Sequence, residues 1–386
     1  MKNLSDTLFI ILALCLMFQS TLNAKVHKEF TKVIEKEHTI GQAGELDIES
    51  KYGNINVTTW NKESVAVKAV ITVKAKSESD ANELLEYINI EFQEGSNYLK
   101  CLTINSFQEN YTWKDYLPWN ISNYKTLEYS IEYTVQMPHS ADLNIENKHG
   151  NIGLADLGGS ADIEQKYGNL SAKDIKGNLK LYLKHGNGTV GSVADLRGEL
   201  GYSNFTLNKA NVVNLESKHS NVEIKEAITL QLESRYDNFE IGTIEEINID
   251  CRYSDYDIEK VSRLTIIASY SDIVLQHLDE SVQAELKYGD FDVRDLKSYF
   301  KDISIISSYT DVDIDIDETI EFDLDVEGEH LDVPEKLFKL RSGIFTSATT
   351  LVIKSKIKEV SIKTKEKVQG IPRIKAIMKY GSFNVQ

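Results

Sequence analysis

The stretch EQKYGNLSA, residues Glu164 to Ala172, is one copy of the pattern that decides the fold. Near copies are ESKYGNINV at Glu49 to Val57 and ENKHGNIGL at Glu146 to Leu154. From the copy at Glu146 on, an aromatic residue recurs in steps of 17 or 18 residues, with a last step of 21. A fixed period of this size is typical of a solenoid, whose repeats bury their apolar faces against their neighbours. The aromatic positions are His149, Tyr167, His185, Tyr202, His219, Tyr236, Tyr253, Tyr270, Tyr288 and Tyr309, with Tyr52 and Tyr380 as outlying copies.

Columns of apolar residues around each aromatic residue indicate the kind of solenoid. Counted from the aromatic residue, positions −6, −4, +3, +5 and +8 are apolar in nearly every copy. This alternation on both sides of a Gly-Asn corner predicts a strand, a tight bend and a second strand in each repeat. We therefore expect an all-β chain, a parallel β-helix or β-roll with 17–18 residues per coil and a right-handed path. All four prolines lie outside His139 to Val333, as a continuous β-ladder requires.

The chain divides into four predicted segments. Residues 1–24 resemble a secretory signal peptide, because the apolar run from Leu8 to Phe18 is too short to span a bilayer. Residues 25–140 form a β-strand module with the first KYGN coil and a short helix at Ser79 to Tyr87, capped by Ser77. Residues 141–317 hold the repeats, and residues 318–386 hold acidic and basic strands with the final coil. We expect this C-terminal part to act as a cap.

The corner position two residues after each aromatic residue changes from Asn to Asp along the chain. Stacked Asn side chains can bond their own turn and the next coil, so we predict a structural ladder. Stacked Asp side chains repel one another unless solvent or a cation intervenes, which leaves a weak calcium site open as the one cofactor hypothesis. The ladder residues are Asn151, Asn169, Asn187, Asn204, Asn221 and Asn238, and the calcium candidates are Asp255, Asp272, Asp290 and Asp311.

Three further features bear on partners. Glu at −3 and Lys or Arg at −1 recur, which predicts a solvated face with adjacent columns of opposite charge. The segment from Tyr111 to Tyr124 is rich in aromatic residues, and as a loop it would either bind a sugar or protein partner or pack over the end of the solenoid. Its candidate binding residues are Tyr111, Trp113, Tyr116 and Trp119. Gly, Ser or Asp follows most of the aromatic residues, so we predict a left-handed corner at Gly168 and Gly289.

Charge and cysteine usage restrict the function classes. The sequence has 43 Lys and Arg against 60 Asp and Glu, a net charge of −17, which disfavours duplex nucleic acid and anionic lipid as partners. After signal cleavage only Cys101 and Cys251 remain, without zinc-site spacing, and their disulfide state stays open. No second apolar run is long enough to span a membrane, so we expect an exported protein of the periplasm, outer surface or extracellular space.

The mature chain resembles a family of secreted bacterial envelope proteins, the putative-adhesin family with a head-GIN-like domain of unknown function. The residues that carry the resemblance are Leu46 to Val57, Trp60, Val65 to Val73, Tyr133 to Pro138 and Lys379 to Val385. The similarity covers most of residues 28–386. It implies a β-helix fold and an envelope location, and it brings no catalytic residues with it.

Three function classes follow. We expect a non-catalytic surface or envelope solenoid, an adhesin or assembly scaffold that binds a protein or glycan surface. The alternatives are a polysaccharide-binding or polysaccharide-degrading β-helix and a calcium-responsive structural protein. An enzyme is disfavoured because the links between strands are short and no Asp/Arg/His cluster stands apart from the repeat.

Overall fold

The structure is a computed structural model, and it describes most of the chain after residue 27. The predicted signal peptide and the aromatic segment with Tyr111, Trp113, Tyr116 and Trp119 lie outside the described residues. The chain divides into two compact units, the first made of residues 1–33, 70–89 and 104–130, and the second of residues 34–69, 90–103 and 131–386. The described ranges are 28–105, 129–317, 319–320, 322–333, 350–354, 359–363 and 370–386.

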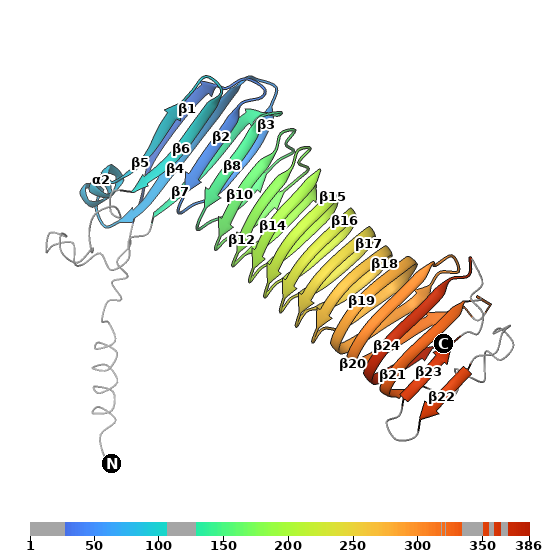
Figure 1. The fold of residues 1–386 in the computed structure, drawn as a ribbon. Helices are drawn as coiled ribbons and strands as arrows, with labels where there is room; N and C mark the ends of the chain where they lie inside the picture. Colours follow the sequence, from blue (N-terminus) through green and yellow to red (C-terminus); the bar gives the residue numbers. More distant parts are fainter. Residues whose placement is uncertain are drawn as a thin grey trace, which may run out of the picture. The chain divides into compact units, whose positions relative to one another are not determined.

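The second unit contains a parallel β-solenoid, as predicted (Figure 1). Each rung repeats the one before it at an offset of one coil, so that Leu215 pairs with Leu232 and Ile224 pairs with Ile241. In the middle, one long strand bends through the whole coil. The strands of this stack are β8 (Asp142–Asn147), β9 (Ile152–Leu154), β10 (Ala161–Lys166), β11 (Leu170–Ala172), β12 (Leu179–Lys184), β13 (Asn187–Ser192), β14 (Asp195–Gly201), β15 (Asn204–Lys218), β16 (Asn221–Arg235), β17 (Asn238–Arg252), β18 (Asp255–Ser269), β19 (Ile273–Leu296) and β20 (Asp302–Ile316).

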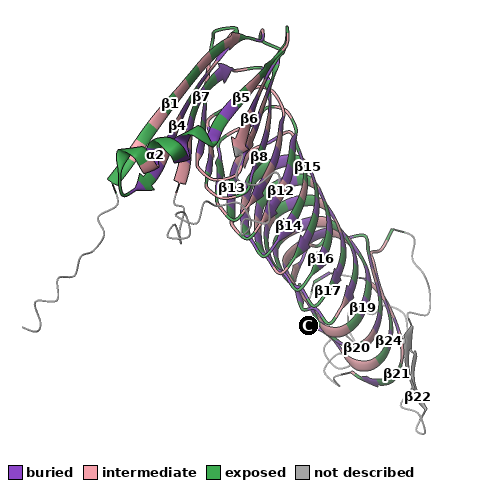
Figure 2. Cartoon of the chain, turned by 90° about the vertical axis from the view of Figure 1, so that its left-hand side faces the viewer, coloured by how far each residue is buried: buried purple, intermediate pink, exposed green. Residues whose placement is uncertain are grey.

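The core is formed by the apolar columns that the sequence predicts. Buried and exposed residues alternate along each strand, and Figure 2 shows these alternating bands on successive rungs. Within one coil, the five apolar positions around Tyr236 are all buried. Because side chains of a strand alternate between its two sides, the same pattern sends every second polar side chain into solvent. The buried residues of this coil are Leu230, Leu232, Phe239, Ile241 and Ile244.

The outlying copy at Tyr52 is a rung of the same stack. Its strands β2 (Glu45–Ser50) and β3 (Ile55–Trp60) pair in parallel with β8 and β9, so that Ile55 lies opposite Ile152. On their other side, β2 pairs with β6 (Tyr98–Asn105), and β3 pairs with β7 (Tyr129–Pro138). The chain between β3 and β8 is therefore an insertion in the sequence, and the two rungs on either side of it are neighbours in space. The remaining strands of this region are β1 (Lys28–Thr39), β4 (Ser64–Ala75) and β5 (Ile88–Glu94).

The first unit includes the predicted short helix. Helix α2 spans Glu78–Glu86, and the hydroxyl of Ser77 accepts a hydrogen bond from the backbone N–H of Asp80, as the capping pattern predicts. Its buried face consists of Ala81, Leu84 and Leu85. Among the described residues, no helix has the length and apolar character needed to cross a membrane.

The C-terminal rungs do not follow chain order. Strand β24 (Arg373–Val385) lies between β20 and β21 (Asp323–Asp332) and pairs in parallel with both. The far edge of β21 pairs antiparallel with β23 (Glu359–Lys363), which pairs with β22 (Thr350–Lys354). His330 in β21 stacks on Tyr380 and extends the aromatic column by a rung that the repeat did not predict. An ion pair also joins β24 to β21, because the guanidinium of Arg373 lies 2.7 Å from an oxygen of Asp325.

The corners correct one prediction. The left-handed residue in eleven corners is the aromatic Tyr or His itself, with φ between 52° and 61°, whereas in the corners at Tyr52 and His149 the positive φ lies at Gly53 and Gly150. Gly168 is not left-handed, whereas Gly289 has a φ of 140°. Glycine is needed at Gly168 for space, because a Cβ there would lie 1.8 Å from the carbonyl oxygen of Gly150 in the neighbouring rung. Eleven rungs therefore hold a side chain in a backbone region that non-glycine residues rarely adopt.

Candidate binding face

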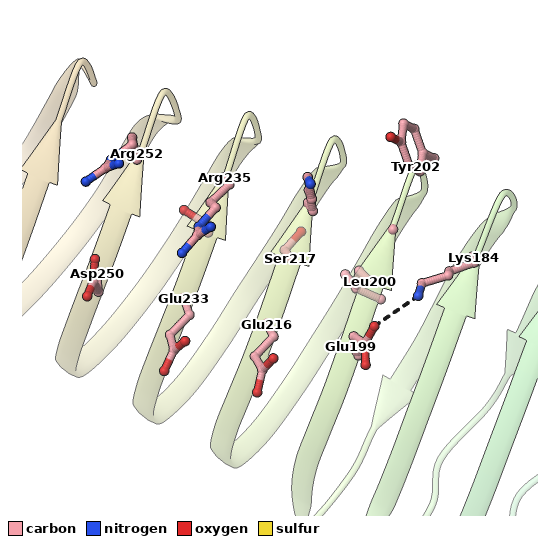
Figure 3. Close-up of a pocket in the computed structure, with 13 residues that line it drawn as sticks. Lys184, Glu199, Leu200, Tyr202, Glu216, Ser217, Glu233, Arg235, Asp250 and Arg252 are labelled. Carbon is pink, nitrogen blue, oxygen red and sulfur yellow. Dashed lines mark ion pairs between the residues drawn. The ribbon is translucent and has the colours of Figure 1, made fainter.

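Two columns of opposite charge line the same outward side of the solenoid. They lie at positions −3 and −1 before each aromatic corner, so alternation along the strand exposes both. Figure 3 shows the carboxylates of Glu199, Glu216, Glu233 and Asp250 in one row and the cations of Lys184, Arg235 and Arg252 in the next. We call this surface the charged face. It consists of an acidic column (Glu199, Glu216, Glu233 and Asp250) and a basic column (Lys184, Lys218, Arg235 and Arg252).

A shallow groove of about 630 Å³ lies between these columns. It passes over Gly201, which stands in the basic column without a side chain. The stem of Lys184 lies over this position, since a Cβ on Gly201 would meet its side-chain carbons at 3.2 Å. The Nζ of Lys184 lies 3.1 Å from Glu199 and 4.4 Å from the ring centre of Tyr182. Hydrogen bonding to Tyr182, followed by Glu199, raises the pKa of Lys184, which stays charged.

The other charged groups of the face do not pair with one another. In the described part of the chain, the only ion pair within 4.0 Å among the eight residues is that between Lys184 and Glu199. The remaining carboxylates and cations are held on β15, β16 and β17, whose backbones are fixed by continuous parallel pairing. Six charged ends are therefore available to a partner on a pre-organised surface: Glu216, Glu233, Asp250, Lys218, Arg235 and Arg252.

The aromatic column forms a continuous ladder beside the charged face. Thirteen described rings from Tyr52 to His330 stack with centroids 4.6–5.1 Å apart and interplanar angles of 2–21°. Each interior ring has both faces covered by neighbours, so solvent meets only ring edges and hydroxyls. Tyr202, the most exposed of the stacked tyrosines, keeps 56% of its surface accessible. Ring faces are thus not available for stacking on a sugar.

The corner asparagines lie directly above one another and bond from rung to rung. The amide of Asn204 donates to the Oδ1 of Asn187 at 2.8 Å, and the amide of Asn221 donates to Asn204 at 2.8 Å. Nearer the N-terminus, the backbone N–H of Asn169 donates to the Oδ1 of Asn151 at 3.0 Å. The amide of Asn238 continues the series by donating to Asn221 at 3.1 Å. Every predicted ladder residue takes part in these bonds.

The corner aspartates keep only the backbone half of this arrangement. The backbone N–H of Asp272 donates to Asp255 at 3.2 Å, and that of Asp290 donates to Asp272 at 3.0 Å. Asp311 accepts from the backbone and hydroxyl of Ser382. Burial, followed by the charges of Asp272 and Asp311, raises the pKa of Asp290. Across the described ranges, no group of three or more His, Cys, Asp or Glu side chains is arranged to hold a metal ion.

A charged cluster gathers beside the irregular coil formed by β19. The pairing of β18 with β19 shifts its register between Val261 and Arg263, and the pairing of β19 with β20 shifts between Val293 and Leu296. Extra residues of β19 bulge out at both places. There Asp295 lies 2.8 Å from the Nδ1 of His277, and Asp279 lies 3.1 Å from the Nζ of Lys260. The hydroxyl of Tyr299, in the loop Lys297–Lys301, donates a hydrogen bond to Asp279 at 3.2 Å. The step of 21 residues was the available signal for this irregularity.

Cys101 and Cys251 are both free and buried. Burial is the main cause that raises the pKa of Cys101 and of Cys251 to about 12. Each thiol therefore stays protonated and unreactive at neutral pH.

No protein-family model matches the sequence, and neither does any curated protein. Among solved structures, a putative adhesin from Parabacteroides distasonis is 13% identical with a TM-score of 0.35, over 73% of this chain and 97% of that one. A putative adhesin from Parabacteroides merdae is 13% identical with a TM-score of 0.34, over 73% and 96%. A putative cell adhesion protein from Clostridium sporogenes is 8% identical with a TM-score of 0.17, over 93% and 99%.

Proposed function

We propose that this chain is a non-catalytic, exported solenoid that binds a protein or glycan partner through its charged face, in an adhesin-like or assembly role. The observation that carries the proposal is the set of six unpaired charged ends on the groove. Their carboxylates and cations stand at rung spacing, about 4.8 Å, on a backbone that needs no ordering when a partner binds. Export is supported by the signal-like sequence of residues 1–24.

Electrostatic complementarity explains how such a face acts. Charges arranged in fixed columns select a partner with the opposite pattern and speed its approach, while like charges reject other surfaces. The recurrent residues elsewhere already have structural work, because rings stack and corner amides bond between rungs. In the charged face, all of which the structure describes, six of the eight charged side chains form no ion pair with one another, the exception being Lys184 with Glu199.

The test compares residues 25–386 with two variants of matched charge in a glycan array and a pull-down. The face variant carries Glu216→Gln, Glu233→Gln, Lys218→Gln and Arg235→Gln. The control carries Glu223→Gln, Glu240→Gln, Lys209→Gln and Lys225→Gln, which lie on the same rungs but outside the charged face. We expect the wild-type protein and the control to capture the same partner and the face variant to lose it.

Two results would overturn the proposal. Capture that survives in the face variant and fails in the control would assign binding to another surface. Turnover of a polysaccharide that a single point substitution abolishes would contradict the non-catalytic role.

A further inference from the structure

The two columns of the charged face are self-complementary. On each rung, the acidic position precedes the basic position by two residues on one strand, a separation of about 6.6 Å. Register pairing places Glu216 beside Glu233 and Lys218 beside Arg235, so both columns run along the stacking direction. A two-fold axis parallel to this direction, set between the columns, brings each acidic column opposite the basic column of a second copy.

Only this orientation is complementary. A two-fold axis in the plane of the face but perpendicular to the columns would place acid on acid and base on base. We propose that the charged face docks on the same face of a second copy, with the two solenoids parallel. The inference rests on the proposed function and names the partner of that same face. The contact is isologous, with each unpaired charge facing its opposite on the equivalent rung.

The exceptions in the columns fit this arrangement. Where Tyr182 replaces the acid, it would face a lysine, a contact that it already makes within the chain at 4.4 Å from Lys184. Where Gly201 replaces the base, it would face Glu199, whose charge Lys184 already neutralises. The charges that lack a partner in the monomer are the ones that find one in the dimer.

The face stays matched beyond the charged rungs. On two later rungs isoleucine replaces the acid, and serine replaces the base on the same strand, so a large apolar side chain faces a small one. Ile267 and Ile306 are exposed to 50% and 52%, which is unusual for isoleucine. Between them, one rung returns to acid and base. The residues involved are Ile267 with Ser269, Glu285 with Lys287, and Ile306 with Ser308.

The size of the face suits a stable contact. Two preceding rungs, with Glu146 and Lys148 and with Glu164 and Lys166, continue the same columns. Seven rungs from Glu146 to Asp250, at about 4.8 Å each, by a strand of six residues give roughly 34 Å by 20 Å. Two such faces bury about 1,400 Å² in total, within the range of specific protein interfaces. Since most of this area is polar, we expect the dimer to weaken strongly as salt screens its charges.

The test exchanges the charges. One variant carries Glu216→Lys and Glu233→Lys, and the other carries Lys218→Glu and Arg235→Glu, both in residues 25–386. Sedimentation velocity at low salt should show a wild-type dimer, a dissociation constant raised at least about tenfold in each variant alone, and a mixed dimer when the variants are combined. A control with Glu223→Lys and Glu240→Lys should remain dimeric, and circular dichroism should show every variant folded.

Cross-linking checks the orientation. Ser308→Cys should cross-link to its own copy in a parallel dimer, and a mixture of Ser269→Cys and Ser308→Cys proteins should give no mixed product, because the two rungs differ in height. The native cysteines are buried and do not compete.

The possible failures are distinguishable. A wild-type protein that stays monomeric while its charged face captures another partner overturns self-docking and leaves the proposed function standing. A dimer that neither charge-exchange variant weakens, or variants that do not combine, overturns self-docking as well. If the face variant with four glutamines loses neither dimer nor partner, both proposals fail.

Discussion

The rungs with corners from Tyr52 to Tyr236 and those from Tyr253 to Tyr309 share one backbone and one aromatic column but differ in their corner side chains. We call them the asparagine half and the aspartate half. In the asparagine half, a side-chain amide donates to the rung before it, as Asn221 does to Asn204. In the aspartate half, the carboxylate of Asp272 accepts a hydrogen bond from the backbone N–H of Asp290, but the side chain has no N–H to donate. The backbone thus tolerates both corners, and the difference lies in electrostatics.

The charged face changes at nearly the same place, while the interior does not. Asp250 and Arg252 end the run of successive charged rungs, and Ile267 with Ser269 follow on the next strand. Inside, Phe239 and Tyr256 stack across the boundary with centroids 4.8 Å apart. The apolar columns therefore fix the coil, and the outward columns vary independently of it. The following predictions test how far this separation holds.

The largest effect is expected at the tight corner of the asparagine half. Gly168→Ala would bring a Cβ to within 1.8 Å of the carbonyl oxygen of Gly150. We expect the free energy of unfolding to fall by about 3 kcal/mol or more, because backbone and not a side chain must move. Chemical denaturation measures the loss.

The control occupies the same column in the aspartate half. Ser254→Ala removes a hydroxyl that accepts from the backbone N–H of Asp237, at an expected cost of about 1 kcal/mol. Equal losses at the two positions would show that the tight approach of rungs at Gly168 is not what requires glycine.

Exchanging the corner residues tests the electrostatic difference. Asn221→Asp removes the donor to Asn204 and sets a carboxylate beside an acceptor, which should lower the free energy of unfolding by about 1 kcal/mol. Asp272→Asn should raise it by a similar or smaller amount at neutral pH. Denaturation at pH 7 measures both, and changes of the same sign would contradict the comparison.

A buried carboxyl provides the pH test. Asp237 occupies the corner column next to the aromatic residue, where neighbouring rungs carry serine, and burial raises its pKa. The folded state therefore favours the protonated form of Asp237. The contribution of this carboxyl to the free energy of unfolding is full in acid and is lost as pH rises through its folded pKa. Asp237→Ser should stabilise the protein by about 1 kcal/mol at pH 8 and by less at pH 4.

The matched measurement uses Ser220→Ala, in the same column. Its effect should not vary over this pH range, because no titrating group is removed. If Asp237→Ser destabilises the protein more at pH 8 than at pH 4, the backbone donors stabilise the carboxylate of Asp237. The statement that burial raises the pKa of this carboxyl would then be wrong.

The smallest effect concerns cations in the aspartate half. If screening alone relieves the repulsion of Asp255, Asp272, Asp290 and Asp311, calcium and sodium at matched ionic strength should raise the melting temperature equally. We expect this result. A shift specific to millimolar calcium that disappears in Asp272→Asn with Asp290→Asn would establish a site by mass action.

Much of the fold could be predicted from the sequence because the information is local. Alternation at period 2 and the spacing of Leu230, Leu232 and Phe239 specify strand, corner and buried face without reference to distant residues. The same columns gave the opposite charges at Glu216 and Lys218. The groove over Gly201 could not be predicted, since it depends on where the stem of Lys184 lies.

Other features depend on which copies become neighbours in space. A repeat does not specify this, so the position of β24 between two earlier strands could not be inferred. The left-handed φ of Tyr167 was assigned to the glycine after it, because steric preference alone favours glycine there. His330 was missed since Gly328 and Leu331 depart from the usual residues around the aromatic position.

The insertion of β24 also has a consequence for biogenesis. Because a chain leaves the ribosome from its N-terminal end, β20 and β21 are made before β24, the strand that pairs with both. Until Arg373–Val385 arrives, both hold open edges that invite pairing with other chains. Folding of this protein therefore includes a late, vulnerable interval, in which a chaperone that shields strand edges would protect it.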